Sequence, residues 1–208
     1  TPSKGSLGGV SYGTREASII LDAAGYDFIF IETVGVGQSE TMAANLVDIF
    51  TLIVGPGSGD ELQGIKKGIT EYADIFIVNK NDGDLKLQAS KTASDYKSAL
   101  SFYSKQDNQA AKEVLLVSSI EQQGMDSVID TINEIIKFNK LNKIFDLRRE
   151  NQLSYWIKEE IRNQIQSKLD LEVSNDTELL DMTKAVIKGE ISIYDVSDHF
   201  LDKFLKKI

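Results

Sequence analysis

Short apolar runs that alternate with helical stretches constrain the fold of this chain more than any other feature. Four runs, at residues 28–32, 48–54, 74–78 and 114–117, have the length and the β-branched or aromatic content of buried strands. Stretches with apolar residues at helical spacing separate one run from the next. This alternation predicts a parallel sheet within a doubly wound α/β domain.

The helical pattern divides the chain into two parts. After about residue 140 no further strand is predicted, and the apolar residues recur only at helical spacing. We therefore expect a domain over residues 1–139 and a helical extension over residues 140–208 that could serve in dimerisation. The predicted helices cover residues 10–24, 38–46, 61–72, 85–106, 124–138, 143–169, 176–188 and 193–207.

Composition excludes several classes of function. The 208 residues include 41% hydrophobic residues, carry a net charge of −9 and contain no cysteine, so we expect neither disulfides nor a thiolate metal site. Lysine and arginine form no basic block, which argues against nucleic-acid binding. No run reaches transmembrane length, and we expect a cytoplasmic protein. The chain starts at Thr1 without a signal peptide, and we expect an interior piece of a longer chain.

Polar and small residues gather where the predicted strands end. Glu32 ends the first run, a glycine-rich stretch at residues 55–60 ends the second, and polar segments at 79–82 and 118–119 end the others. Parallel α/β sheets bind ligands at the carboxyl ends of their strands. A carboxylate there can hold a metal ion or its waters, and glycines let backbone N–H groups approach a phosphate. We expect one ligand site on this edge.

The segment Asn79-Lys80-Asn81-Asp82 has the N-K-x-D pattern and a specific chemistry. Guanine presents two adjacent donors, N1–H and the N2 amino group, which one carboxylate such as Asp82 accepts as a bidentate pair. Adenine lacks the N2 donor and would leave the carboxylate unsatisfied, which corresponds to discrimination of roughly 10⁴ or more. The aliphatic part of Lys80 can cover the face of the base, and Asn79 can connect neighbouring loops. This segment predicts a guanine reader.

The fourth run ends in Ser118-Ser119-Ile120. In a guanine pocket this position supplies a backbone N–H to guanine O6, so we expect the backbone to matter more than the side chains. The triplet follows the N-K-x-D segment by one predicted helix and one predicted strand, which places both at the same edge of the sheet.

Several stretches together resemble the MeaB/ArgK family of P-loop GTPases, which belong to the metallochaperone (SIMIBI) group and accompany adenosylcobalamin-dependent acyl-CoA mutases such as methylmalonyl-CoA mutase. The resemblance extends over residues 1 to about 170 and is most specific between 27 and 84. The matching stretches are Leu7-Gly8-Gly9-Val10, Thr14-Arg15-Glu16, the residues from Glu32 to Glu40, those from Pro56 to Gly68, and those from Asn79 to Asp84.

The resemblance implies a role for each matching position. Glu32 corresponds to the acid at the Mg²⁺ site, and Gly35 to the glycine whose N–H meets the γ-phosphate of GTP. Gln63 and Lys66 match residues that activate hydrolysis in a third switch, which responds to the mutase partner. The resemblance also implies that GTP or GDP is bound through Asn79, Lys80, Asp82, Ser118, Ser119 and Ile120, and that the protein is a homodimer.

Two departures from the family pattern stand out. Asn81 replaces the usual alanine, and we expect little effect because this position faces away from the base. More important, no G-x-x-x-x-G-K-S/T motif occurs in the 208 residues. The first strand and P-loop of the family are therefore expected to lie upstream of this sequence. Each hydrogen bond to a charged phosphate contributes roughly 1.5–3 kcal/mol, so without that loop we expect these residues to bind GTP feebly.

Three other interpretations remain open. A related metallochaperone GTPase could serve a nickel enzyme, although one histidine and no cysteine argue against this client. The second interpretation is an ATP-dependent kinase linked to amino-acid transport. The N-K-x-D segment argues against it, because this segment favours guanine over adenine. A third is a non-catalytic remnant that only binds a partner through its helical extension.

Overall fold

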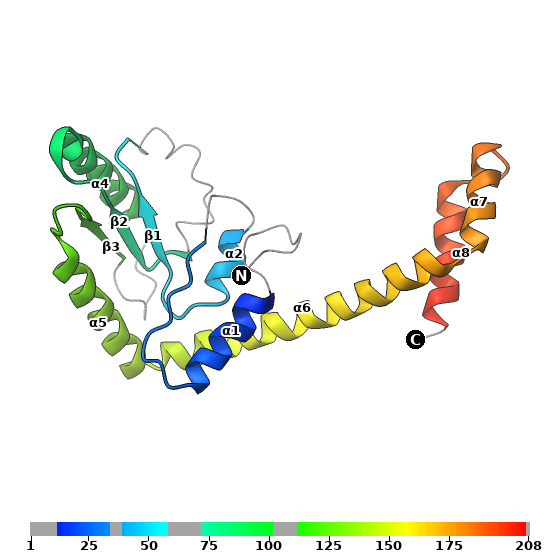
Figure 1. Ribbon diagram of the computed structural model, residues 1–208, viewed down its shortest axis with the longest axis horizontal. Coiled ribbons are helices and arrows are strands. Elements are labelled where there is room, and N and C mark those ends of the chain that lie inside the picture. Colours follow the sequence, from blue (N-terminus) through cyan, green and yellow to red (C-terminus); the bar gives the residue numbers. More distant parts are fainter. Residues whose placement is uncertain (1–11, 34–38, 58–71, 102–111, 207–208) are drawn as a thin grey trace. The chain divides into compact units, whose positions relative to one another are not determined.

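The computed structural model describes residues 12–33, 39–57, 72–101 and 112–206. The chain separates into two compact units, Thr1–Gln152 and Leu153–Ile208. The first unit holds the sheet and the helices around it, and the second holds most of a long helix followed by two shorter ones (Figure 1).

A three-stranded parallel sheet lies at the centre of the first unit. Its strands are β1 (Thr51–Val54), β2 (Ile75–Val78) and β3 (Glu113–Leu116), in the order β1-β2-β3. The register aligns Thr51 with Ile75 and Ile75 with Glu113. All four residues of β2 are buried, as expected for a central strand covered on both faces. The prediction of a parallel sheet from alternating strands and helices is confirmed.

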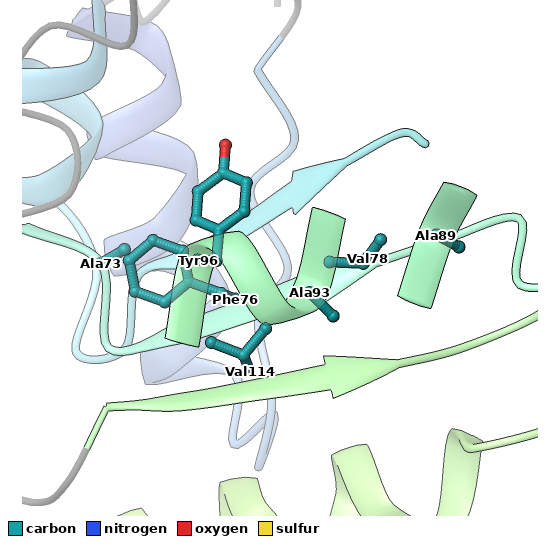
Figure 2. Packing of buried hydrophobic residues seen from close by; sticks show 7 residues of the cluster. All are labelled: Ala73, Phe76, Val78, Ala89, Ala93, Tyr96 and Val114. Atoms are coloured by element: carbon teal, nitrogen blue, oxygen red, sulfur yellow. The ribbon is translucent and has the colours of Figure 1, made fainter. Parts of the chain in front are cut away.

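Helices α4 (Lys86–Ser101) and α5 (Met125–Leu141) cover opposite faces of this sheet (Figure 1). Side chains alternate between the faces along β2, as the two-residue period of a strand requires. Phe76 and Val78 pack against α4, and the ring centroids of Phe76 and Tyr96 are 5.7 Å apart (Figure 2). On the other face Ile75 and Ile77 pack in a cluster with residues of α5.

The strand predicted at residues 28–32 is not formed. The segment has no regular structure, and the side chain of Phe30 is 88% exposed. A strand requires a neighbouring strand that pairs with its backbone N–H and C=O groups. In the part of the chain that the structure describes, none pairs with this segment, and apolar content alone cannot substitute. Helix α1 (Tyr12–Ala23) precedes it and the short helix α2 (Ser39–Ala44) follows.

Helix α6 (Ile144–Asn175) begins in the first unit and extends beyond residue 169, where its predicted end lay. Its first turns bind the amino ends of the strands. Both terminal nitrogens of Arg148 donate to the carboxylate of Asp74 at 2.9 Å, and the same carboxylate accepts the Phe50 N–H at 2.8 Å. The Arg149 guanidinium forms a second bidentate pair, with Asp48.

The second unit contains the rest of α6 together with α7 (Glu178–Ile187) and α8 (Ile193–Leu205). A capping box starts α8: the Ser192 hydroxyl accepts the Asp195 N–H, and the Asp195 carboxylate accepts the Ser192 N–H. None of the described helices combines the length and apolarity needed to cross a membrane. The helix predicted at residues 61–72 lies outside the described residues, apart from its last residue.

Candidate functional site

The carboxyl ends of β2 and β3 place two polar loops beside each other. The parallel register aligns Val78 with Leu116, so the segments that follow these residues leave the sheet side by side. Backbone hydrogen bonds continue past the strands: Val117 N–H donates to Val78 at 2.9 Å, and Asn81 N–H donates to the Val117 carbonyl at 3.0 Å. The two loops predicted to share one site therefore do lie together.

The side chain of Asn79 connects the two loops. Its Oδ1 accepts the Lys80 N–H at 2.7 Å, the Ser119 N–H at 3.2 Å and the Ser119 hydroxyl at 3.0 Å. Lys80 adopts a left-handed backbone conformation with φ of 62°, which is rare for a residue with a side chain. Such conformations persist only where the surroundings enforce them, and they occur often at ligand sites.

The carboxylate of Asp82 is oriented by Ser118. The Ser118 hydroxyl donates to Asp82 Oδ2 at 2.5 Å and accepts the Glu121 N–H at 3.0 Å. Ser118 is fully buried, so its rotamer is fixed. Among the described residues no donor reaches Asp82 Oδ1, which leaves that oxygen, and the second lone pair of Oδ2, available to a ligand. Sequence reasoning assigned the backbone the larger role here and missed this hydroxyl.

The turn after β3 is closed by two backbone hydrogen bonds between Ser118 and Gln123, of 3.0 and 3.1 Å. Gly124 follows with φ of 78°, and a Cβ atom there would lie 2.4 Å from the Leu116 carbonyl oxygen. Only glycine fits at this position. The turn presents Ile120, which is 84% exposed and whose N–H meets no acceptor within the described ranges.

Helix α4 starts directly behind the first loop. Asp82 precedes the short 3₁₀ helix η2 (Gly83–Leu85), and Lys86 continues into α4. From α4, the Thr92 hydroxyl reaches the end of β1 and accepts the Gly57 N–H at 3.1 Å. Sequence reasoning missed this contact, because a threonine in a polar helix carries no signal of a partner 35 residues away.

The remaining predicted residues are not brought to this site by the described structure. Glu32 is exposed and lies in the irregular segment between α1 and α2. Gly35, Gln63 and Lys66 lie outside the described residues. Within the described part of the chain, no three potential ligands among His, Cys, Asp and Glu lie together. One accessible carboxylate nevertheless suits Mg²⁺, which binds one or two carboxylates and otherwise keeps water and phosphate oxygens.

Together, a parallel α/β sheet and an N-K-x-D loop held at its carboxyl edge define the class of P-loop GTPases. Residues 1–174 match the family model described as "Methylmalonyl Co-A mutase-associated GTPase MeaB". The chain belongs to this family of GTPases, as the sequence resemblance predicted.

Relatives and solved structures agree with this assignment. The chain is 37% identical to "GTPase ArgK" of Escherichia coli over 168 residues, which are 79% of this chain and 50% of that protein. It is 34% identical to "Methylmalonic aciduria type A homolog, mitochondrial" of Mus musculus over 98% of this chain and 49% of that protein. The crystal structure of a "LAO/AO transport system kinase" is similar with a TM-score of 0.68 at 28% identity, over 93% of this chain and 62% of that one. The chain thus spans about half to three fifths of the lengths of these proteins.

Proposed function

We propose that the chain is part of a GTP-binding and GTP-hydrolysing protein that assists an adenosylcobalamin-dependent acyl-CoA mutase. The observation that carries this proposal is the orientation of Asp82 by the buried Ser118 hydroxyl, at the edge where parallel sheets bind nucleotides. The family description names the mutase, and three relatives carry names that refer to methylmalonic aciduria.

The loops suit guanine in their chemistry. The Asp82 carboxylate accepts N1–H and the N2 amino group, while Ser118 keeps it from rotating. The Ile120 N–H supplies the donor to guanine O6, because the neighbouring Ser119 N–H is already bound to Asn79. Lys80, whose backbone is held in a left-handed conformation, lays its methylene groups over the base.

The phosphate and metal roles rest on the family match. Glu32 would hold Mg²⁺ or one of its waters, Gly35 would donate its N–H to the γ-phosphate, and Gln63 and Lys66 would support hydrolysis. When bound, Mg²⁺ supplies neutralisation of the charge that develops on the phosphates. The contribution of these residues is to position water and phosphate.

The phosphate-binding loop is not among the 208 residues, which contain no G-x-x-x-x-G-K-S/T motif. We propose that it belongs to the rest of a longer chain, since the relatives are longer than the part matched here. The 208 residues alone should therefore show no saturable GTP binding at micromolar concentration in isothermal calorimetry. A clean micromolar isotherm would refute the idea that an outside loop is needed.

The helical extension exposes a row of apolar side chains on α6. Along α6, Leu153, Ile157, Ile161 and Ile165 recur every four residues, and each side chain is about half exposed. Apolar residues at this spacing lie along one face of a helix. We propose that a second copy of the protein covers this face. The double variant Ile157→Lys/Ile161→Lys tests this proposal. In analytical ultracentrifugation its mass should fall to that of a monomer.

The experiment that tests the function is Asp82→Asn in the complete GTPase, meaning this chain with its phosphate-binding loop. The amide matches xanthine, whose C2 oxygen replaces the amino donor of guanine. We expect affinity for GTP to fall on the order of 10⁴-fold and xanthosine triphosphate to become the better ligand.

Asp84→Asn is the matched control, since Asp84 is exposed and lies two residues further on, within η2. It should leave nucleotide preference unchanged. Competition by ATP tests the kinase interpretation, which predicts displacement of GTP by ATP. Unchanged preference in Asp82→Asn would remove Asp82 from the base site and with it the proposed function.

A further inference from the structure

The turn after β3 contains a residue in an unfavourable backbone conformation. Gln122 has φ of 55°, in the left-handed region that residues with a Cβ atom rarely adopt. In the described part of the chain three residues other than glycine have a positive φ, and two of them, Lys80 and Gln122, lie in the loops of the base site. The third, Lys143, lies between α5 and α6. Such conformations persist only where the surrounding structure enforces them.

The turn is held at both of its ends. Ser118 and Gln123 pair through two backbone hydrogen bonds of 3.0 and 3.1 Å, so the chain reverses within the four residues between them. Gln122 is the last of these four, and its left-handed conformation completes the reversal. Gly124 follows so close to the Leu116 carbonyl that no Cβ atom fits there. The chain must therefore return to the sheet at a fixed point.

The side chain of Gln122 does not account for this conformation. It is exposed, and its amide has no hydrogen-bond partner among the described residues. Glycine would adopt the same backbone conformation without strain. What remains to be explained is the course of the backbone at Gln122, and the contacts of the turn lead from there to the base site.

Two groups of the turn serve the base site. The Glu121 N–H donates to the Ser118 hydroxyl at 3.0 Å, and that hydroxyl donates to Asp82 Oδ2 at 2.5 Å. The Ile120 N–H, which we propose as the donor to guanine O6, belongs to the same turn. Because the turn is fixed at its far end, a different backbone conformation at Gln122 would force Ile120 and Glu121 to move.

We propose that Gln122 is a positioning residue for guanine, whose left-handed backbone holds the Ile120 N–H and the Ser118 hydroxyl in the orientation that the base requires. This inference rests on the proposed function. It assigns Gln122 a role in nucleotide affinity and none in the rate of hydrolysis, because the contacts of the turn lead to Ser118 and Asp82.

Gln122→Val in the complete GTPase makes the left-handed conformation unfavourable, because a β-branched side chain is a genuine outlier there. The turn is exposed, so in the free protein it can relax by giving up only its own hydrogen bonds. The nucleotide must then restore the turn when it binds. We expect affinity for GDP to fall about tenfold and KM for GTP to rise by a similar factor. The melting temperature, and kcat at saturating GTP, should stay close to those of the parent protein.

Two further substitutions separate the backbone of Gln122 from its side chain. Glycine and asparagine both tolerate the left-handed conformation, so Gln122→Gly and Gln122→Asn should keep affinity for GDP within about threefold of the parent. Lys143→Val is the matched control, because Lys143 has φ of 57° and lies between two helices, far along the chain from the site. It should lower the melting temperature, since a shift there moves a helix, and leave affinity for GDP unchanged.

Fluorescence titration with a labelled GDP and steady-state hydrolysis of GTP measure these quantities. An affinity within about twofold of the parent for Gln122→Val overturns the inference. An equal loss for Gln122→Asn also overturns it, since the amide rather than the backbone would then matter, as does an equal loss for Lys143→Val or a fall in kcat without a rise in KM. A parent protein that binds no GDP contradicts the proposed function itself, and the inference falls with it.

Discussion

At the amino ends of the strands, charged side chains bind one another, whereas at the carboxyl ends they are held by uncharged partners. Asp74 uses both carboxylate oxygens on Arg148 and also accepts the Phe50 N–H. Among the described residues, the carboxylate of Asp82 at the opposite edge accepts a hydrogen bond from the Ser118 hydroxyl alone. Lys80 beside it forms no ion pair within the described part of the chain.

This difference separates the groups that hold the fold from those that remain available to a ligand. At the amino ends of the strands, Asp74 and Asp48 bind helix α6 through Arg148 and Arg149. These charged groups are thus used within the chain. The hydrogen bond with Asp74 raises the pKa of Arg148 above the ordinary value, because this bond favours the charged guanidinium. The carboxyl edge is also held by hydrogen bonds, but within the described residues Asp82 keeps unused lone pairs and Lys80 forms no ion pair. Substitutions at the first edge should therefore change stability, and those at the second should change binding.

Arg148→Ala should have the largest effect on stability. It leaves the carboxylate of Asp74 without its charged partner, and both side chains are largely buried, with 28% and 20% exposed. Breaking such a pair costs roughly 3 kcal/mol in the free energy of unfolding. Urea denaturation measures this loss. Arg162→Ala is the control, because Arg162 is 70% exposed and pairs with Glu159 on the same helix; it should cost about 0.5 kcal/mol or less. Equal losses in the two variants would contradict the assignment of the amino edge to stability.

Ser118→Ala should have the next largest effect, mainly on binding. Asp82 loses the donor that orients it, and the Glu121 N–H loses its acceptor. We expect affinity for GDP in the complete GTPase to fall about tenfold, equivalent to about 1.4 kcal/mol, as for a hydrogen bond to a charged group.

Ser119→Ala is the control for this prediction. The Ser119 hydroxyl is exposed, and its N–H still reaches Asn79 after the substitution. Fluorescence titration with a labelled GDP should show less than a threefold change for Ser119→Ala. A smaller loss of GDP affinity for Ser118→Ala than for Ser119→Ala would mean that the buried Ser118 hydroxyl does not orient Asp82.

These contacts also show how far sequence reasoning reaches. The parallel sheet and the N-K-x-D loop could be predicted because strand periodicity and a four-residue motif are local properties. The pairing of Arg148 with Asp74 spans 74 residues, and the bond from Ser118 to Asp82 spans 36. The residues next to Arg148 and Ser118 in the sequence do not distinguish these two side chains from ones exposed to solvent. The failed strand at 28–32 has the same cause, since a strand depends on a neighbour that local apolar content does not reveal.

Arg149→Ala sharpens the comparison within the amino edge itself. Arg149 forms a bidentate pair with Asp48, as Arg148 does with Asp74, but its side chain is 60% exposed and that of Asp48 35%. Solvent screening should reduce the loss in unfolding free energy to about 0.5 kcal/mol. Urea denaturation in parallel with Arg148→Ala measures the difference. If Arg149→Ala costs as much as Arg148→Ala, geometry rather than burial determines the strength of these pairs.

Lys80→Gly should have the smallest effect on stability, although it should weaken binding. The left-handed conformation costs a residue with a side chain about 1 kcal/mol, which glycine removes, while the greater freedom of glycine in the unfolded chain costs a similar amount. The unfolding free energy should therefore change by less than about 0.5 kcal/mol. Lys143→Gly is the matched control, since Lys143 has φ of 57° between α5 and α6, far along the chain from the site. Both variants should show the same small change in urea, but only Lys80→Gly should lose affinity for GDP. Unchanged affinity in both variants would mean that the Lys80 side chain does not contact the nucleotide, and an equal loss in both would mean that the loss does not arise at the site.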